Sequence, residues 1–166
     1  MSSVIAVREA VLSDLSEIHK MQCLLADHEV PFDANIDLQL KSAEKSGYIG
    51  YVNMEEKIQN KDTFVVVAVS RHGDSELIVG VCYGQIKQDE DWSIYDVFGY
   101  VGCVYIKEDF RGQGIWPEML KFLETWFRER EIKQIRLECY VDNPAAVRAY
   151  SKTDFSPVQY VMHKNL

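Results

Sequence analysis

The segment from residue 104 to residue 116 constrains the fold of this chain more than any other. An apolar, β-branched run ends at Ile106, a charged turn follows, and residues 111–114 read Arg-Gly-Gln-Gly directly before an amphipathic stretch. Glycines at a strand-to-helix turn let the backbone approach a ligand closely and point its N–H groups outward. The N-terminus of the next helix adds a partial positive charge. The segment therefore predicts a turn that binds a phosphate or pyrophosphate.

The glycine spacing excludes two common nucleotide motifs. It is neither the dinucleotide fingerprint G-x-G-x-x-G nor the phosphate loop G-x-x-x-x-G-K-[ST]. The plain alternative is an ordinary helix-entry turn that contains two glycines.

Length and composition favour one soluble globular domain over residues 1–166, with 47% hydrophobic and 27% charged residues. No apolar run approaches the roughly 20 residues that a membrane span requires, and the N-terminus has no basic-then-apolar signal pattern. We therefore expect a cytoplasmic protein without a membrane partner.

The net charge of −8 argues against a general nucleic-acid binder, because contacts to phosphates need a basic surface. The charge mildly favours cationic acceptors such as amines, although a merely soluble acidic surface is the more common explanation of such a charge. The four cysteines form no C-x-x-C pair and are expected to be reduced core residues: Cys23, Cys82, Cys103 and Cys139. The histidines show no ligand spacing, so no metal site is expected: His19, His28, His72 and His163.

Hydrophobic periodicity predicts alternating strands and helices. The expected strands cover residues 4–8, 63–70, 77–86, 98–106, 134–141 and 155–162. The expected helices comprise one that starts with a capping pattern at Ser13 and ends before Pro31, one or two within 34–60, and those at 114–130 and 143–152. Residues 89–92 are expected to form a solvated acidic loop. A β-α-β unit over 98–141 should be parallel, and the earlier strands antiparallel. We therefore predict an α/β fold in which helices flank a central mixed sheet.

A second motif follows the strand expected at 134–141. Residues 143–155 read Asn-Pro-Ala-Ala-Val-Arg-Ala-Tyr-Ser-Lys-Thr-Asp-Phe. Asn143 is suited to cap a helix, with Pro144 at the first helical position. On its own, Tyr150 reads as an ordinary core tyrosine of an amphipathic helix.

Together the two motifs resemble the GNAT family of N-acetyltransferases. Its acetyl-CoA signature is Arg/Gln-x-x-Gly-x-Gly/Ala after a strand; Arg111 and Gly114 match it, whereas Trp116 stands where the family has a small residue. The late segment resembles Asn-x-x-Ala-x-x-x-Tyr-x-x-x-Gly-Phe, with matches at Asn143, Ala146, Tyr150 and Phe155 and with Asp154 in place of glycine. The resemblance covers roughly the last 90 residues well and implies the GNAT acyl-CoA N-acyltransferase fold.

The resemblance also implies roles for individual residues. The backbone N–H of Val104 would stabilise the oxyanion of the thioester, Ile106 would pair with the pantetheine arm, and Tyr150 would protonate the departing thiolate. The remaining cofactor-binding residues would be Arg111, Gly112, Gln113, Gly114, Ile115 and Asn143.

The general base stays open. Strand alternation places Tyr100, Gly102 and Val104 on one face, and Asp96 as well if the strand begins earlier. Family members often carry a glutamate near the position of Tyr100, and this chain lacks that glutamate. Asp96, Glu138 or a chain of waters could serve as the base instead. Trp116 could stack on the cofactor, face the core or narrow the site.

The sequence predicts an acetyl-CoA-dependent N-acetyltransferase that acts on a primary amine of a small molecule or peptide. Direct attack in a ternary complex is expected, because Cys103 points to the face opposite Val104. The alternatives are a non-catalytic acyl-CoA-binding module of the same fold and a nucleotide-binding protein that uses the glycine turn. The acceptor stays open among polyamines, antibiotics, amino acids and protein amines. An apolar final strand at 155–162 predicts a homodimer that buries this strand, and the alternative is that Lys164 and the C-terminal carboxylate keep a short edge soluble.

Overall fold

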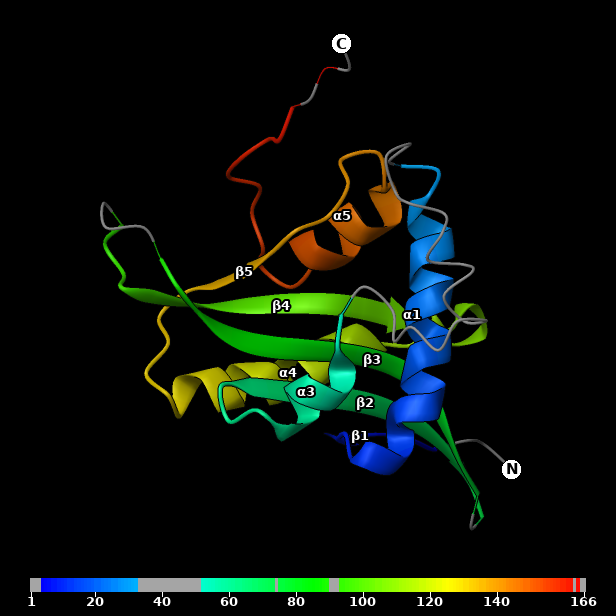
Figure 1. Ribbon diagram of the computed structural model, residues 1–166. Coiled ribbons are helices and arrows are strands. Elements are labelled where there is room, and N and C mark those ends of the chain that lie inside the picture. The colour runs from blue at the N-terminus through cyan, green and yellow to red at the C-terminus, as the bar shows by residue number, and fades with distance from the viewer. Residues whose placement is uncertain (1–3, 33–51, 74, 90–92, 163, 165–166) are drawn as a thin grey trace.

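The computed structural model describes residues 4–32, 52–73, 75–89, 93–162 and 164 (Figure 1). Within these residues, five strands form one sheet in the order β1-β2-β3-β4-β5. The strands are β1 (Val4–Glu9), β2 (Thr63–His72), β3 (Ser75–Gln88), β4 (Val97–Ile106) and β5 (Ile135–Leu137). The helices are α1 (Leu15–Glu29), α3 (Met54–Gln59), α4 (Ile115–Arg128) and α5 (Pro144–Ser151), and two short 3₁₀ turns are η1 (Leu12–Asp14) and η2 (Glu108–Phe110).

The sheet is mixed, as the sequence predicts. Strands β1 to β4 pair antiparallel with their neighbours, and β4 pairs parallel with β5 across the α4 crossover. None of the helices in the described part of the chain has the length and apolar character to cross a membrane.

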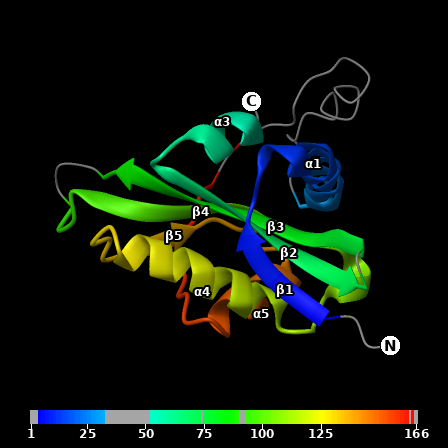
Figure 2. The same cartoon turned by 90° about the horizontal axis from the view of Figure 1, so that it is seen from below.

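Each face of the sheet carries its own apolar core. On one face α4 and α5 cover side chains such as Val79 and Val101, whereas α1 and α3 cover the other face, which includes Val81 and Tyr105 (Figure 2). The alternation of apolar residues along β2 to β4 supplies both cores, because successive side chains of a strand point to opposite faces. The sheet is therefore buried on both sides.

Strands β4 and β5 separate after a short stretch of pairing. Their register joins Gly99 to Ile135 and Val101 to Leu137 and goes no further. Beyond this point the β5 side of β4 has no strand partner among the described residues. The strand predicted at 134–141 is thus confirmed only over its first half, because the chain leaves the sheet after Leu137.

A β-bulge interrupts β4 at the same place. Val81 pairs with Tyr105 and Tyr83 with Gly102, so Cys82 alone opposes Cys103 and Val104. Cys103 takes a left-handed conformation with φ 52°, as an inserted strand residue can. The bulge shifts the alternation, so Val104 packs with the α4 core and not on the face of Tyr100. The predicted common face of Tyr100, Gly102 and Val104 is wrong for this reason.

Asp14, and not Ser13, organises the start of α1. Its carboxylate accepts hydrogen bonds from Arg8, at 2.7 Å and 3.0 Å, and from the backbone N–H of Val11 at 2.8 Å. The Arg8 guanidinium lowers the pKa of the Asp14 carboxyl. Further along α1, Glu17 accepts a 2.6 Å hydrogen bond from Lys107, just beyond β4. These contacts fix α1 against β1 and against the end of β4.

Two further expectations are wrong where the structure describes them. Residues 155–162 form no strand, and Val158 and Val161 are 94% and 90% exposed. Because β5 has only three residues, it offers this segment little edge to pair with, and Pro157 lacks an N–H. The homodimer, which rested on that strand, stays a prediction. Asp89 is also not solvated: it accepts hydrogen bonds from Arg136, and its side chain is 6% exposed.

Some predicted segments lie partly outside the described residues. Of the helical region expected at 34–60, the structure describes residues 52–60, where α3 lies. Residues 90–92 of the expected acidic loop are also outside the described part.

The close approach of Gly99 to α4 yields a stability prediction. A Cβ at this position would lie 2.5 Å from Cε1 of Phe127, whose side chain is 1% exposed. Gly99→Ala should therefore lower the free energy of unfolding by about 1–3 kcal/mol through overpacking, as measured by urea denaturation.

Two further variants test this cause. Gly80→Ala should cost less, because its nearest neighbour is the flexible Met119 side chain at 3.2 Å. In the double variant, Phe127→Leu should reduce the loss of unfolding free energy caused by Gly99→Ala, because the smaller side chain leaves room for the added Cβ. Unchanged stability of Gly99→Ala would contradict the packing described.

Candidate functional site

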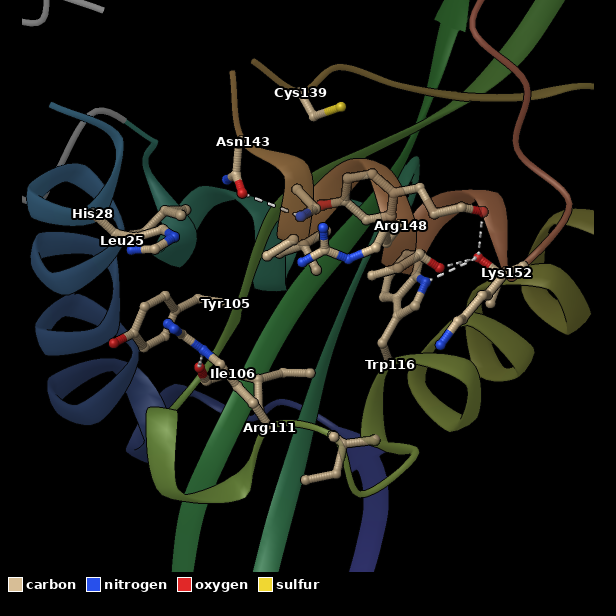
Figure 3. Close-up of a pocket in the computed structure, with 18 of the residues that line it drawn as sticks. Leu25, His28, Tyr105, Ile106, Arg111, Trp116, Cys139, Asn143, Arg148 and Lys152 are labelled. Carbon is tan, nitrogen blue, oxygen red and sulfur yellow. Dashed lines mark hydrogen bonds between the residues drawn. The ribbon is translucent and has the colours of Figure 1, made fainter. Parts of the chain in front are cut away.

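A cavity of about 550 Å³ opens where β4 and β5 separate (Figure 3). Its lining residues come from the end of α1, from β4, from the glycine turn with the start of α4, and from the chain between β5 and the end of α5. All of the predicted site residues except Gln113 line it: Val104, Ile106, Arg111, Gly112, Gly114, Ile115, Asn143 and Tyr150. The structure thus brings the glycine turn and the 143–155 motif, which lie about 30 residues apart in the sequence, to one cavity.

The glycine turn is open towards the cavity. Gly112 and Gly114 have φ angles of 75° and 77°, which favour glycine over other residues. A Cβ at either position would meet nothing within 4 Å, so the backbone is accessible there. Gly114 is the N-cap of α4, and the first N–H groups of a helix have no acceptor within it. This combination suits an anionic group.

Side chains of the turn hold its shape. Nε of Arg111 donates to the carbonyl of Ile106 at 3.0 Å, and the guanidinium lies 5.7 Å from the centre of the Tyr105 ring. Gln113 does not line the cavity; its amide donates to the carbonyl of Asp109 at 3.0 Å. The Gln113 side chain therefore braces the turn, and the sequence offered no signal for this orientation.

Tyr150 faces the cavity from α5 and rests on Trp116. The two ring centres lie 5.3 Å apart in an edge-on arrangement, and Trp116 is only 6% exposed. Nε1 of Trp116 donates to Oγ1 of Thr153 at 3.0 Å. Trp116 is thus packed into the core, and it also lines the cavity. Burial raises the pKa of the Tyr150 phenol, so the group keeps its proton at neutral pH.

Asn143 acts as the helix cap that the sequence predicts. Its Oδ1 accepts a hydrogen bond from the N–H of Ala146 at 3.1 Å, and the residue is 9% exposed. Beyond the other end of α5, Asp154 has φ 67°, a left-handed conformation that is common after helices. Aspartate adopts this conformation more readily than most residues, so it can stand where the family has glycine.

Glu138 is the better placed of the two carboxylates considered as a base. It lines the cavity, and its Oε2 accepts a 3.4 Å hydrogen bond from the hydroxyl of Tyr100. Burial, and next the charge of Glu138, raise the pKa of Tyr100 to about 12. Asp96 is exposed, does not line the cavity and precedes β4 at the end far from the glycine turn.

The end of α1 adds residues that the sequence did not single out for the site. His28 and Glu29 line the cavity. Phe32 lies edge-on to His28 at 5.7 Å and stacks on Tyr140 at 6.3 Å, which joins α1 to the chain after β5. Only the fold brings these positions together, so no local pattern could have revealed them.

Two of the four cysteines differ from the expected core position, and one of them is Cys23, which is only partly buried and belongs to neither core cluster. Cys103 does face away from Val104, and burial raises the pKa of its thiol to about 12. Cys139, which was expected in the core, is instead exposed and lines the cavity, although burial also raises its pKa. Among the described residues, no group of three or more His, Cys, Asp or Glu side chains is arranged to hold a metal ion.

Known proteins resemble this chain in sequence and in fold. The chain matches the Acetyltransferase (GNAT) family over residues 26–155. The uncharacterized N-acetyltransferase YobR of Bacillus subtilis (strain 168) is 29% identical over 66 residues, which are 40% of this chain and 27% of that protein. A structure described as a predicted acetyltransferase with acetyl-CoA, from Clostridium acetobutylicum, superposes with a TM-score of 0.70 at 19% identity over 98% of this chain and 96% of its own.

An aminoglycoside antibiotic 6'-N-acetyltransferase from Acinetobacter baumannii also superposes, with a TM-score of 0.70 and 14% identity, over 98% of this chain and 99% of its own. At these identities the solved structures show the fold alone. The family match extends over most of the chain and includes the glycine turn, β4 and α5. The chain therefore belongs to the acetyltransferase (GNAT) family and has its fold, a mixed sheet flanked by helices.

Proposed function

We propose that this protein transfers an acetyl group from acetyl-CoA to a primary amine of a small molecule or peptide. The observation that carries the proposal is the convergence of the glycine turn, β4 and α5 on one cavity at the separation of two strands. Further support comes from the family match and from the similar structure determined with acetyl-CoA. We further propose a single-domain, cytoplasmic enzyme that needs no metal.

The residues present fit the cofactor. Gly112 and Gly114 leave room for a pyrophosphate beside the backbone N–H groups of residues 112–115, whereas the N–H of Arg111 already donates to the carbonyl of Glu108 at 3.1 Å. The partial positive charge at the start of α4 complements the charge of the pyrophosphate. Ile106 would pair with the pantetheine arm along the side of β4 that β5 has left. Asn143 would contribute mainly by fixing the start of α5, because its Oδ1 is engaged as a cap.

Three residues would act on the reacting groups. The N–H of Val104, at the bulge, would donate to the carbonyl oxygen of the thioester as negative charge develops there. Tyr150 would give its proton to the departing thiolate. Glu138, directly or through water, would accept the proton that the ammonium form of the acceptor must lose. The attack of the amine on the thioester would be direct.

The glycine turn yields the first functional prediction. Acetyl-CoA should raise the melting temperature, because it binds only the folded chain. Gly114→Glu should abolish this rise, because a carboxylate would enter the space for the pyrophosphate. Gly73→Glu is a matched control, since Gly73 has φ 58°, has an open Cβ position and lies outside the cavity. A full shift in the Gly114 variant would remove the turn from the site.

Tyr150 yields the second functional prediction. Tyr150→Phe keeps the ring on Trp116 and deletes the proton donor, so kcat should fall roughly 10²-fold or more while acetyl-CoA affinity changes little. Tyr160→Phe, at an exposed position, should change neither quantity. Steady-state kinetics of CoA release measures both. If Tyr150→Phe turns over at the wild-type rate, Tyr150 has a structural role only.

Cys139 is the thiol that could carry an acetyl group in a two-step mechanism, because it lines the cavity. Direct transfer predicts that Cys139→Ala keeps kcat within about threefold of wild type. It also predicts intersecting lines in a two-substrate kinetic analysis. Parallel lines, together with loss of turnover in Cys139→Ala, would replace direct attack by a covalent route.

A further inference from the structure

A second cavity lies on the α1 and α3 face of the sheet and is lined by polar side chains. Its volume is about 260 Å³, and residues of α3, the start of β2 and β3 surround it, among them Lys57, Tyr83 and Gln85. Nζ of Lys57 donates to Oε1 of Gln85 at 2.9 Å and lies 4.2 Å from the centre of the Tyr83 ring. The ammonium group therefore has donor capacity left after these contacts.

The amides around this cavity are oriented as donors. Oδ1 of Asn53 accepts the N–H of Glu56 at 3.1 Å, and Oδ1 of Asn60 accepts the N–H of Asp62 at 2.9 Å. In each side chain the NH₂ group is the part that remains for a ligand. A half-buried ammonium together with two amide donors is a set suited to an anion.

The ammonium of Lys57 has a neutral hydrogen-bond partner and a second lysine, Lys87, near it. Lys87 places its Nζ 3.5 Å from the centre of the Tyr100 ring, and no carboxylate among the described residues forms an ion pair with Lys57 or Lys87. Burial lowers the pKa of Lys57, Lys87 lowers it further, and Glu56, an exposed residue on the cavity rim, opposes them. A bound anion would stabilise the charged form of Lys57 and so offset the effects of burial and of Lys87.

A row of side chains connects this cavity to the candidate site. The rings of Tyr83 and Tyr100 lie 6.3 Å apart, and the hydroxyl of Tyr100 donates to Glu138, which lines the larger cavity. Tyr83 and Gln85 pair with Gly102 and Tyr100, which precede Val104 by two and four residues. At about 3.3 Å per residue, these two lining residues lie level with points roughly 7–13 Å along β4 from Val104.

We infer that the acceptor is an amphoteric molecule: a primary amine that also carries an anionic group, a carboxylate or phosphate, several bonds away. The anionic group binds at Lys57, with the amides of Asn53 and Asn60, while the amine reaches Glu138. The inference rests on the proposed acetyl transfer and names its substrate class. Polyamines and aminoglycosides carry only positive charge at neutral pH and would bring it close to Lys57 and Lys87.

The test compares acceptors that differ only in the anionic group. A series of ω-amino acids of four to eight carbons, L-lysine and matched aminoalkyl phosphates would each be assayed beside its uncharged amide or ester, with aliphatic diamines as cationic probes. We expect kcat/KM for the preferred acid to exceed that for its amide by roughly tenfold or more. The series distinguishes carboxylate from phosphate. Equal values throughout, with turnover present, would overturn the inference and leave the acetyl transfer intact.

Variants connect the preference to the cavity. Lys57→Met should bring the acid-to-amide ratio close to one, mainly through KM, and Lys57→Arg should restore part of it. Lys121→Met is the matched control, because Lys121 is an exposed lysine of α4 that pairs with Glu118 and lines neither cavity. A ratio that Lys57→Met leaves unchanged would overturn the assignment.

Calorimetry distinguishes this inference from the proposed function. If no amine releases CoA, the same pairs titrated into the protein still test the anion site: tighter binding of an acid than of its amide, lost in Lys57→Met, supports the site without the transfer. Equal binding of acid and amide, or binding of neither, overturns it.

Discussion

The separation of β4 from β5 is the constraint on which the rest of the site depends. The two strands pair only from Gly99 to Val101, and beyond that point the backbone of β4 keeps one side free of any described strand. Backbone N–H and C=O groups that are left without a ladder partner must find another, in water or in a ligand. The larger cavity therefore lies in the gap between the two strands, and the unpaired backbone N–H and C=O groups of β4 are available to a ligand there (Figure 3).

The elements around the gap are each fixed from outside it. Lys107 joins the end of β4 to Glu17 of α1 at 2.6 Å, which holds the first helix beside the cavity. On the opposite face, Trp116 supports Tyr150 at 5.3 Å and bonds to Thr153. Because interiors are densely packed, such contacts leave a side chain few alternative positions. These contacts fix the residues around the cavity, whose open side has no strand among the described residues.

The proposed acceptor path has a carboxylate at one end and an ammonium group at the other. Glu138 lies at the end near Tyr150, and Lys57 lies at the other end, with Tyr83 and Tyr100 between them. If the acceptor binds as proposed, the net charge of −8 says little about it. The balance of the whole surface describes solubility and long-range fields, whereas a substrate meets only the charges near its binding site.

The sequence predicted those elements whose structure depends on a few neighbouring residues. The glycine turn, the β4-α4-β5 crossover and the Asn143 cap could be read from the sequence, because turn residues, hydrophobic periodicity and capping act over a few neighbours. Features that depend on how one strand pairs with another could not be predicted from the sequence. The bulge at Cys103 depends on the register with β3, and it reverses the face of Val104.

The same limit applies at the end of the chain and around the site. Residues 155–162 have strand-like composition, yet β5 is too short to pair with them. The places of His28 and Glu29 in the cavity wall follow only from how α1 packs. The family resemblance predicted the fold correctly, because its two motifs lie on elements that local patterns do specify.

The central claim is that the gap between β4 and β5 binds acetyl-CoA through the backbone. The most direct measurement is a titration of ¹⁵N-labelled protein with acetyl-CoA, followed by amide NMR shifts. We predict the largest changes at Val104, at Gly112 to Ile115 and at the start of α5, with small changes in β1 and β2. Changes concentrated elsewhere, or none at saturating acetyl-CoA, would contradict it.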